Sequence, residues 1–152
     1  MIEWYKDNEL TIKFSDVPCV GVRIIIPTMS KEEKANAKAK PFLNRRRLLV
    51  DIKYMDRVFC FVIPKFYYWN GANIPRFFWR LIGSKSEPKF LIPSMVHDIL
   101  CENHNYIDND RYLSSLIFRA LLKTAGINPI SRWAMFHSVD NFQKFQGWNM
   151  RK

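Results

Sequence analysis

The chain has 152 residues, of which 48% are hydrophobic and 15% aromatic, so it can build one well-packed core and is too apolar to be a disordered chain. Lys and Arg number 24 against 14 Asp and Glu, a formal net charge of +10 that favours acidic partners or phosphates. The sequence contains no apolar run of about 18 residues, no signal-peptide pattern and no Cys-x-x-Cys pair. These features predict one domain over residues 1–152 that stays in a cytoplasm and has no disulfide framework.

The N-terminal half of the chain has the pattern of strands. Residues Leu10–Phe14 alternate between apolar and polar, and Cys19–Ile26 is apolar and β-branched. Leu48–Tyr54 and Val58–Ile63 flank a short connection, which predicts a hairpin. The Ala- and Lys-rich segment Ser30–Pro41 is expected to be a loop or a short exposed helix.

The C-terminal half has the pattern of helices, each with a capping residue at its start. The helices are expected from Ser94 to about Asn103, from Asp108 to Gly126, and from Asn128-Pro129 to about Gly147. Strands followed by helices predict an α+β fold, in which an antiparallel sheet from the N-terminal half packs with about three helices from the C-terminal half.

The adjacent residues His97 and Asp98 are the candidate catalytic residues. A helical histidine followed by an aspartate occurs in sites where the imidazole is a general base and the carboxylate binds a cation or orients the base. The same helix offers a second interpretation, since His97, Cys101 and His104 would share one helical face and could hold zinc or another divalent metal. The spacing matches no standard zinc pattern, so we expect no bound metal. A buried, hydrogen-bonded His97 beside a packed Cys101 is the plainer alternative.

A second unusual segment follows the strands. Gly71 permits a positive φ or a close backbone approach, and the neighbouring asparagines can bond to turn amides. The aromatic and basic run Arg76–Arg80 comes next, which can stack on nucleotides or lipid headgroups, or form a helical turn with buried aromatics. These features predict a binding loop made of Asn70, Gly71, Ala72, Asn73, Ile74 and Pro75.

A basic stretch runs from Lys31 to Arg47, where only Glu32 and Glu33 oppose the positive charges. Such a stretch can bind phosphates or an acidic partner, and the alternative is a solvated segment that keeps the protein soluble. The predicted basic patch consists of Lys38, Lys40, Arg45, Arg46 and Arg47.

Three segments occur in a characteristic order: Ile63-Pro64-Lys65-Phe66, Trp69-Asn70-Gly71-Ala72-Asn73-Ile74-Pro75 and Val96-His97-Asp98-Ile99-Leu100-Cys101. Their order and spacing resemble the phage and prophage family called domain of unknown function 1353, over about Leu48 to Gly126. The chain departs from the family pattern where the family has a loop Asp, a loop Ser, a helix Tyr and a second-helix Ala-Asp. Those positions are Asn70, Asn73, Cys101 and Ser114-Ser115 here.

These departures make an active enzyme less expected, because a carboxamide cannot act as a base and a neutral oxygen binds divalent cations more weakly. We expect a phage-encoded accessory or virion-associated protein that docks on a phage or host protein and keeps a vestigial or structural His-Asp site. It would lie in the host cytoplasm or be incorporated into the virion. One alternative is a small hydrolase with His97 as general base and Asp98 as metal ligand or orienter. The other is an unspecific module that binds nucleic acid weakly through the basic stretch.

Overall fold

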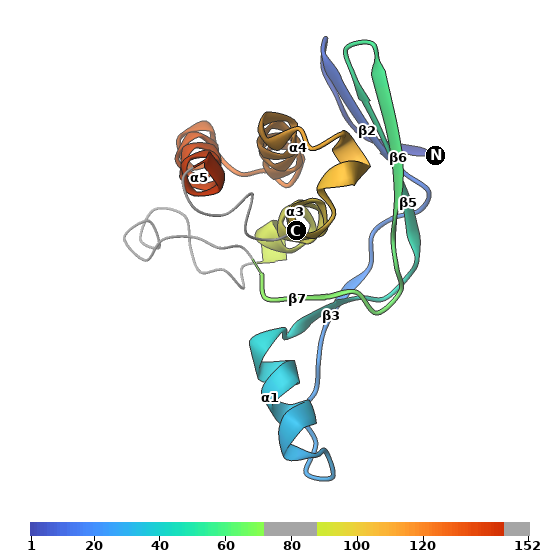
Figure 1. Cartoon of the computed structure of the whole chain (residues 1–152), viewed down its shortest axis with the longest axis vertical. Helices are drawn as coiled ribbons and strands as arrows, with labels where there is room; N and C mark the ends of the chain where they lie inside the picture. Colours follow the sequence, from blue (N-terminus) through green and yellow to red (C-terminus); the bar gives the residue numbers. More distant parts are fainter. Residues whose placement is uncertain (72–87, 145–152) are drawn as a thin grey trace.

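The computed structural model describes residues 1–71 and 88–144, and Figure 1 shows a sheet with helices packed on one of its faces. The sheet is antiparallel, with strand order β1-β2-β5-β6. Its strands are β1 (Ile2–Lys6), β2 (Leu10–Phe14), β5 (Leu48–Tyr54) and β6 (Arg57–Ile63). The expected strand at Leu10–Phe14 and the expected hairpin are therefore confirmed. The strand β1 was missed by the sequence analysis.

The alternation of side chains along each strand decides which face of the sheet is buried. In β2, Leu10, Ile12 and Phe14 are buried, whereas Thr11 and Lys13 are half-buried on the other face. The strands β5 and β6 continue the buried surface, and the helices complete the core from the other side. The main contributors are Leu48, Val50, Ile52, Phe61, Ile63, Met95, Leu100, Leu113 and Ile117.

The helices confirm the α+β fold class. They are α3 (Pro88–Glu102), the 3₁₀ helix η2 (His104–Ile107), α4 (Arg111–Thr124) and α5 (Pro129–Phe142). The side chain of Asn128 caps α5, and Gly126 follows α4 with a positive φ of 84°, so both of these sequence signals are confirmed. The expected end of the last helix, Gly147, lies outside the described residues.

Two expected helix starts are wrong. Ser94 lies inside α3, where the buried Phe90 and Leu91 already belong to the helix and Pro93 is tolerated within it. Asp108 does not cap α4, because the extra turn η2 intervenes and leaves Asp108 in the left-handed conformation with φ 53°. The N-cap of α4 is Asp110, whose carboxylate accepts a hydrogen bond from the Leu113 backbone at 2.9 Å.

A second, three-stranded sheet has the order β3-β4-β7 and carries an arm that projects from the body (Figure 1). Its strands are β3 (Val20–Val22), β4 (Phe42–Asn44) and β7 (Tyr68–Trp69), and α1 (Lys31–Ala39) lies in the arm. The expected strand Cys19–Ile26 is therefore too long: after β3 the chain leaves the sheet, and Ile24, Ile25 and Ile26 are exposed. The helical alternative for the Ala- and Lys-rich segment is confirmed by α1.

Candidate functional site

The imidazole of His97 lies in a polar network between α3 and α5. The side-chain amide of Gln143, directly after α5, donates to His97 Nε2 at 2.9 Å and to Cys101 Sγ at 2.9 Å. The Cys101 sulfur lies 3.7 Å from His97 Nε2, and the ring of Phe118 lies 5.0 Å from the imidazole centroid. An amide NH2 group can only donate, so Nε2 is the acceptor in this contact.

The acceptor end of the Gln143 amide faces α4. Its Oε1 lies 3.1 Å from the Ser115 hydroxyl and 3.3 Å from the Ser114 hydroxyl, and both serines are buried. Ser115 also lies 3.3 Å from Oδ1 of Asp140, and that carboxylate forms an ion pair with Arg111. The network therefore runs from His97 through Gln143 and Ser115 to Asp140. The carboxylate of Asp140 is in turn paired with Arg111.

The contacts of His97 bear on whether it could act as a base. A general base needs a free lone pair within hydrogen-bond reach of the proton that it takes, and here His97 Nε2 already accepts from an amide. The carboxylate of Asp140 connects to the histidine through Ser115 and Gln143. Cys101 is 3% exposed, so its sulfur is part of the core rather than a surface nucleophile.

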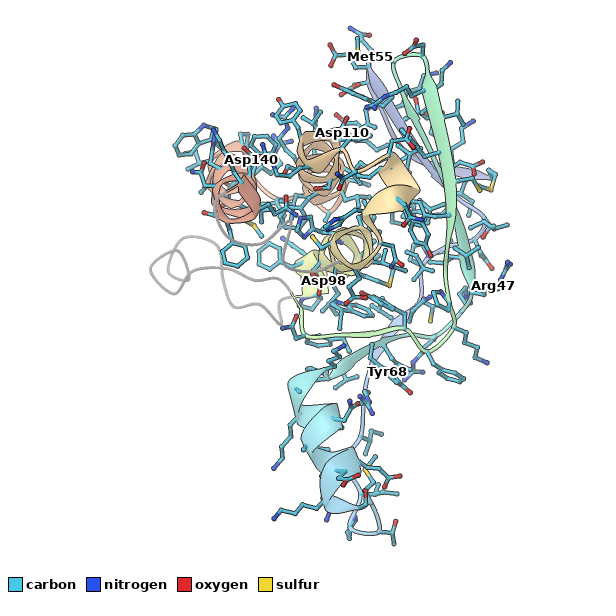
Figure 2. All side chains as sticks on the ribbon, viewed as in Figure 1. Arg47, Met55, Tyr68, Asp98, Asp110 and Asp140 are labelled. Carbon is cyan, nitrogen blue, oxygen red and sulfur yellow. The ribbon has the colours of Figure 1, made fainter. Side chains whose placement is uncertain are left out.

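The side chain of Asp98 leaves α3 in a different direction from that of His97, since successive side chains on a helix are about 100° apart. Figure 2 labels Asp98, which belongs to α3. Next to it, the Tyr67 hydroxyl donates to Glu102 at 3.0 Å. Burial raises the pKa of Tyr67, and the charges of Glu102 and Asp98 raise it further. The contacts described for His97 lie toward Gln143 and Phe118, whereas the charge of Asp98 acts on Tyr67.

The alternative metal stripe of His97, Cys101 and His104 is not continuous along one helix. The helix α3 ends at Glu102, and His104 belongs to the separate turn η2, so it does not follow Cys101 on the same helical face. In the described parts of the chain, no group of three or more His, Cys, Asp or Glu side chains has an arrangement that could hold a metal ion. Within this possible ligand set, the Cys101 sulfur lies 3.7 Å from His97 Nε2.

Only the start of the predicted binding loop can be described. Asn70 is exposed, and Gly71 is buried with a φ of 88°, as expected from a glycine that permits this conformation. The rest of the loop, Ala72–Pro75, lies outside the described residues, and so does the run Arg76–Arg80.

The predicted basic patch is divided between two elements. Lys38 and Lys40 belong to α1 and its C-cap, whereas Arg45, Arg46 and Arg47 connect β4 to β5. Arg46 forms an ion pair with Asp16 at 2.8 Å, on the side of the body rather than on the arm. The strand β4 therefore separates the two halves of the basic stretch along the chain.

Gln143 and Asp140 are the network members that the sequence analysis missed. Both lie at the C-terminal end of the last helix, and the sequence around them has no recognisable motif. Their partners come from α3 and α4, so only the packing of three helices reveals them. Arg111, the ion-pair partner of Asp140, was missed as well, whereas Ser114 and Ser115 were named in the sequence analysis as departures from the family pattern.

No helix in the described part of the chain is both long and apolar enough to cross a membrane. No curated protein and no solved structure matches the chain. One family model does match, with the description "Protein of unknown function (DUF1353)", and it covers residues 46–139, from the start of β5 through most of α5. The chain therefore belongs to the DUF1353 family.

Proposed function

We propose that this chain is a phage-encoded accessory or virion-associated protein that docks on another protein through the projecting arm, residues 20–44. The observation that carries the proposal is a row of exposed isoleucines on the arm: Ile24 is 77% exposed, Ile25 42% and Ile26 48%. Contiguous exposed apolar side chains are typical of interaction sites.

Local contacts stabilise the arm. Ser30 and Glu33 form a reciprocal capping box at the start of α1. Arg23 donates to Asn36 at 2.6 Å, which ties the strand β3 side of the arm to α1, and its guanidinium lies 3.9 Å from the Tyr68 ring centroid. A preorganised surface loses less conformational entropy when it binds.

The chemistry of the arm indicates the kind of partner. Exposed lysines of α1 and its C-cap, Lys31, Lys38 and Lys40, accompany the isoleucines. The matching surface is therefore an apolar pocket bordered by carboxylates, on a phage or host protein. The His97–Gln143 network supports the same proposal, because a histidine engaged by a carboxamide suits a structural or vestigial site better than a hydrolase.

The experiment compares virus particles assembled with the wild-type chain and with the variant Ile24→Ser, Ile25→Ser, Ile26→Ser. We expect the wild type to remain with purified particles and the variant to be reduced at least about tenfold, with an unchanged melting temperature. The matched control is Val58→Ser, since Val58 is 71% exposed on the main sheet, outside the arm. Absence of the wild type from particles, or equal retention of the variant, contradicts the proposal.

A different result would support the hydrolase alternative. A hydrolytic activity that disappears in His97→Ala while the melting temperature stays unchanged would show that the histidine is a base and replace the docking proposal.

A further inference from the structure

A groove of about 340 Å³ lies between the β1–β2 connection, α4 and α5. Its described lining residues include no member of the His97–Gln143 network and no residue of the arm. Ligand sites for small molecules fall in the range of about 300–1,000 Å³, so the groove has room for one small ligand. Figure 1 shows the three elements at the end of the molecule opposite α1. We call it the α5 groove.

One wall of the α5 groove is an exposed aromatic surface. Trp133 lines the groove and is 65% exposed, which is unusual for so large an apolar side chain. The ring of His137, one helical turn later, lies 4.8 Å from it and limits its rotation. A flat, partly fixed indole that faces solvent is suited to stack on another flat ring.

The same groove contains positive charges from two helices. Arg119 and Lys123 line it one turn apart on α4, and Arg132 lines it from α5, beside Trp133. The guanidinium of Arg119 lies 4.8 Å from the Phe136 ring centroid, so an aromatic ring supports its position. Cations that converge from two elements can bind one phosphate.

Two carboxylates also line the groove, on the strand side. Asp7 is already engaged within its turn: it accepts from the backbone of Glu9 and Leu10 and from the Tyr5 hydroxyl, at 2.7–2.8 Å. Glu9 is exposed at the same connection. The three cations therefore outnumber the carboxylates, and the positive side of the groove is the helical side next to Trp133.

We propose that the α5 groove binds a nucleotide, whose base stacks on Trp133 and whose phosphate is held by Arg119, Lys123 and Arg132. The shared chemistry is one base and one phosphate, which either a free nucleotide or a nucleotide within a single strand supplies. Stacking on an aromatic side chain accepts any base, so the site discriminates by shape and charge rather than by sequence.

The test is titration calorimetry of the full chain with adenosine monophosphate, adenosine, inorganic phosphate and a short single-stranded oligodeoxyadenylate. Adenosine monophosphate is expected to bind at least about tenfold more tightly than adenosine or phosphate alone, because both halves of the site contribute. If the oligonucleotide binds more tightly than adenosine monophosphate, the ligand is a nucleotide within a single strand. If adenosine monophosphate binds more tightly, the ligand is a free nucleotide. Both outcomes support the site.

The variants Trp133→Ala and Arg132→Gln should each weaken the best nucleotide ligand by about tenfold or more. Ile130→Ala and Lys53→Gln are the matched controls and should bind like the wild type, since Ile130 is 75% exposed on α5 and Lys53 is exposed on β5, and neither lines the groove. Equal affinity for phosphate and nucleotide, an unaffected Trp133→Ala variant, or no binding of any of these ligands overturns the proposal.

Discussion

The side chain of Gln143 donates a hydrogen bond to Nε2 of His97 at 2.9 Å, which joins the end of α5 to the middle of α3. The same amide reaches Cys101 and the hydroxyls of Ser114 and Ser115. One buried carboxamide therefore bonds to polar groups from two other helices, α3 and α4. A buried polar group that loses its partner keeps the cost of its desolvation, so this amide is a sensitive point of the fold.

Gln143→Leu should lower the free energy of unfolding by about 1–3 kcal/mol, because it leaves buried polar groups without this partner. Chemical denaturation of the wild type and the variant measures the difference. Asn141→Ala is the control, since Asn141 is exposed two residues earlier. A variant as stable as the wild type would show that the amide does not hold α5 on α3.

Asp110 has two roles, as N-cap of α4 and as partner of Arg57 at the end of the β5–β6 hairpin, at 2.6 Å. Asp110→Ala removes both and should cost about 0.5–2 kcal/mol of unfolding free energy, mainly through the lost cap. Asp110→Asn keeps a capping oxygen and should cost less, because a partly exposed ion pair contributes little to stability. Equal losses in both variants would show that the ion pair, not the cap, dominates.

The sequence predicted the α+β class, the central hairpin and the caps at Gly126 and Asn128, because each of these depends on a local pattern. It misplaced the start of α3, since the burial of Phe90 and Leu91 outweighs the capping preference of Ser94. It could not predict the projecting arm, because the same apolar, β-branched pattern serves a buried strand and an exposed segment.

The candidate site was predicted only in part, for a similar reason. His97 and Cys101 follow each other at helical spacing, so their contact can be read from one helix. The partner Gln143 lies 46 positions after His97 in the chain. Such a contact depends on how α3, α4 and α5 pack, which no local pattern encodes. The groove beside Trp133 escaped prediction for the same reason, since its walls come from strands and helices distant in sequence.

Ser94 lies in the core, where its hydroxyl accepts from the Trp69 indole at 3.0 Å and donates to the Leu91 carbonyl at 3.1 Å. Ser94→Ala leaves the indole N–H of a 1% exposed tryptophan without this acceptor. We expect a loss of about 1–3 kcal/mol in unfolding free energy, measured by denaturation with tryptophan fluorescence. Ser138→Ala is the control, because the Ser138 hydroxyl bonds only to its own helix at Ala134 among the hydrogen bonds described. Similar losses in both variants would argue against a special role of the Trp69 contact.

The carboxylate of Asp7 gives the stability of the protein a defined pH dependence. Burial opposes its ionisation, but hydrogen bonds from the backbone of Leu10 and Glu9 and from the Tyr5 hydroxyl outweigh this and hold the pKa of Asp7 below its ordinary value of 3.8. A carboxyl whose pKa is lower in the folded state stabilises the fold when it is ionised. This contribution is therefore fully present above about pH 4 and is lost as the pH falls below that range, through the folded-state pKa.

Asp7→Asn removes the ionisation but keeps a side-chain oxygen for the turn. We expect the variant to be less stable than the wild type at neutral pH, and the difference between them to shrink as the pH falls below 3.8, the ordinary pKa of this carboxyl. Denaturation curves at several pH values measure this difference, and NMR titration of the Asp7 carboxyl reports its pKa directly. A difference that stays constant from neutral to acid pH, or an Asp7 pKa at or above 3.8, would contradict the prediction. Glu3→Gln is a suitable control on β1, because Glu3 is exposed and lies outside the β1–β2 connection.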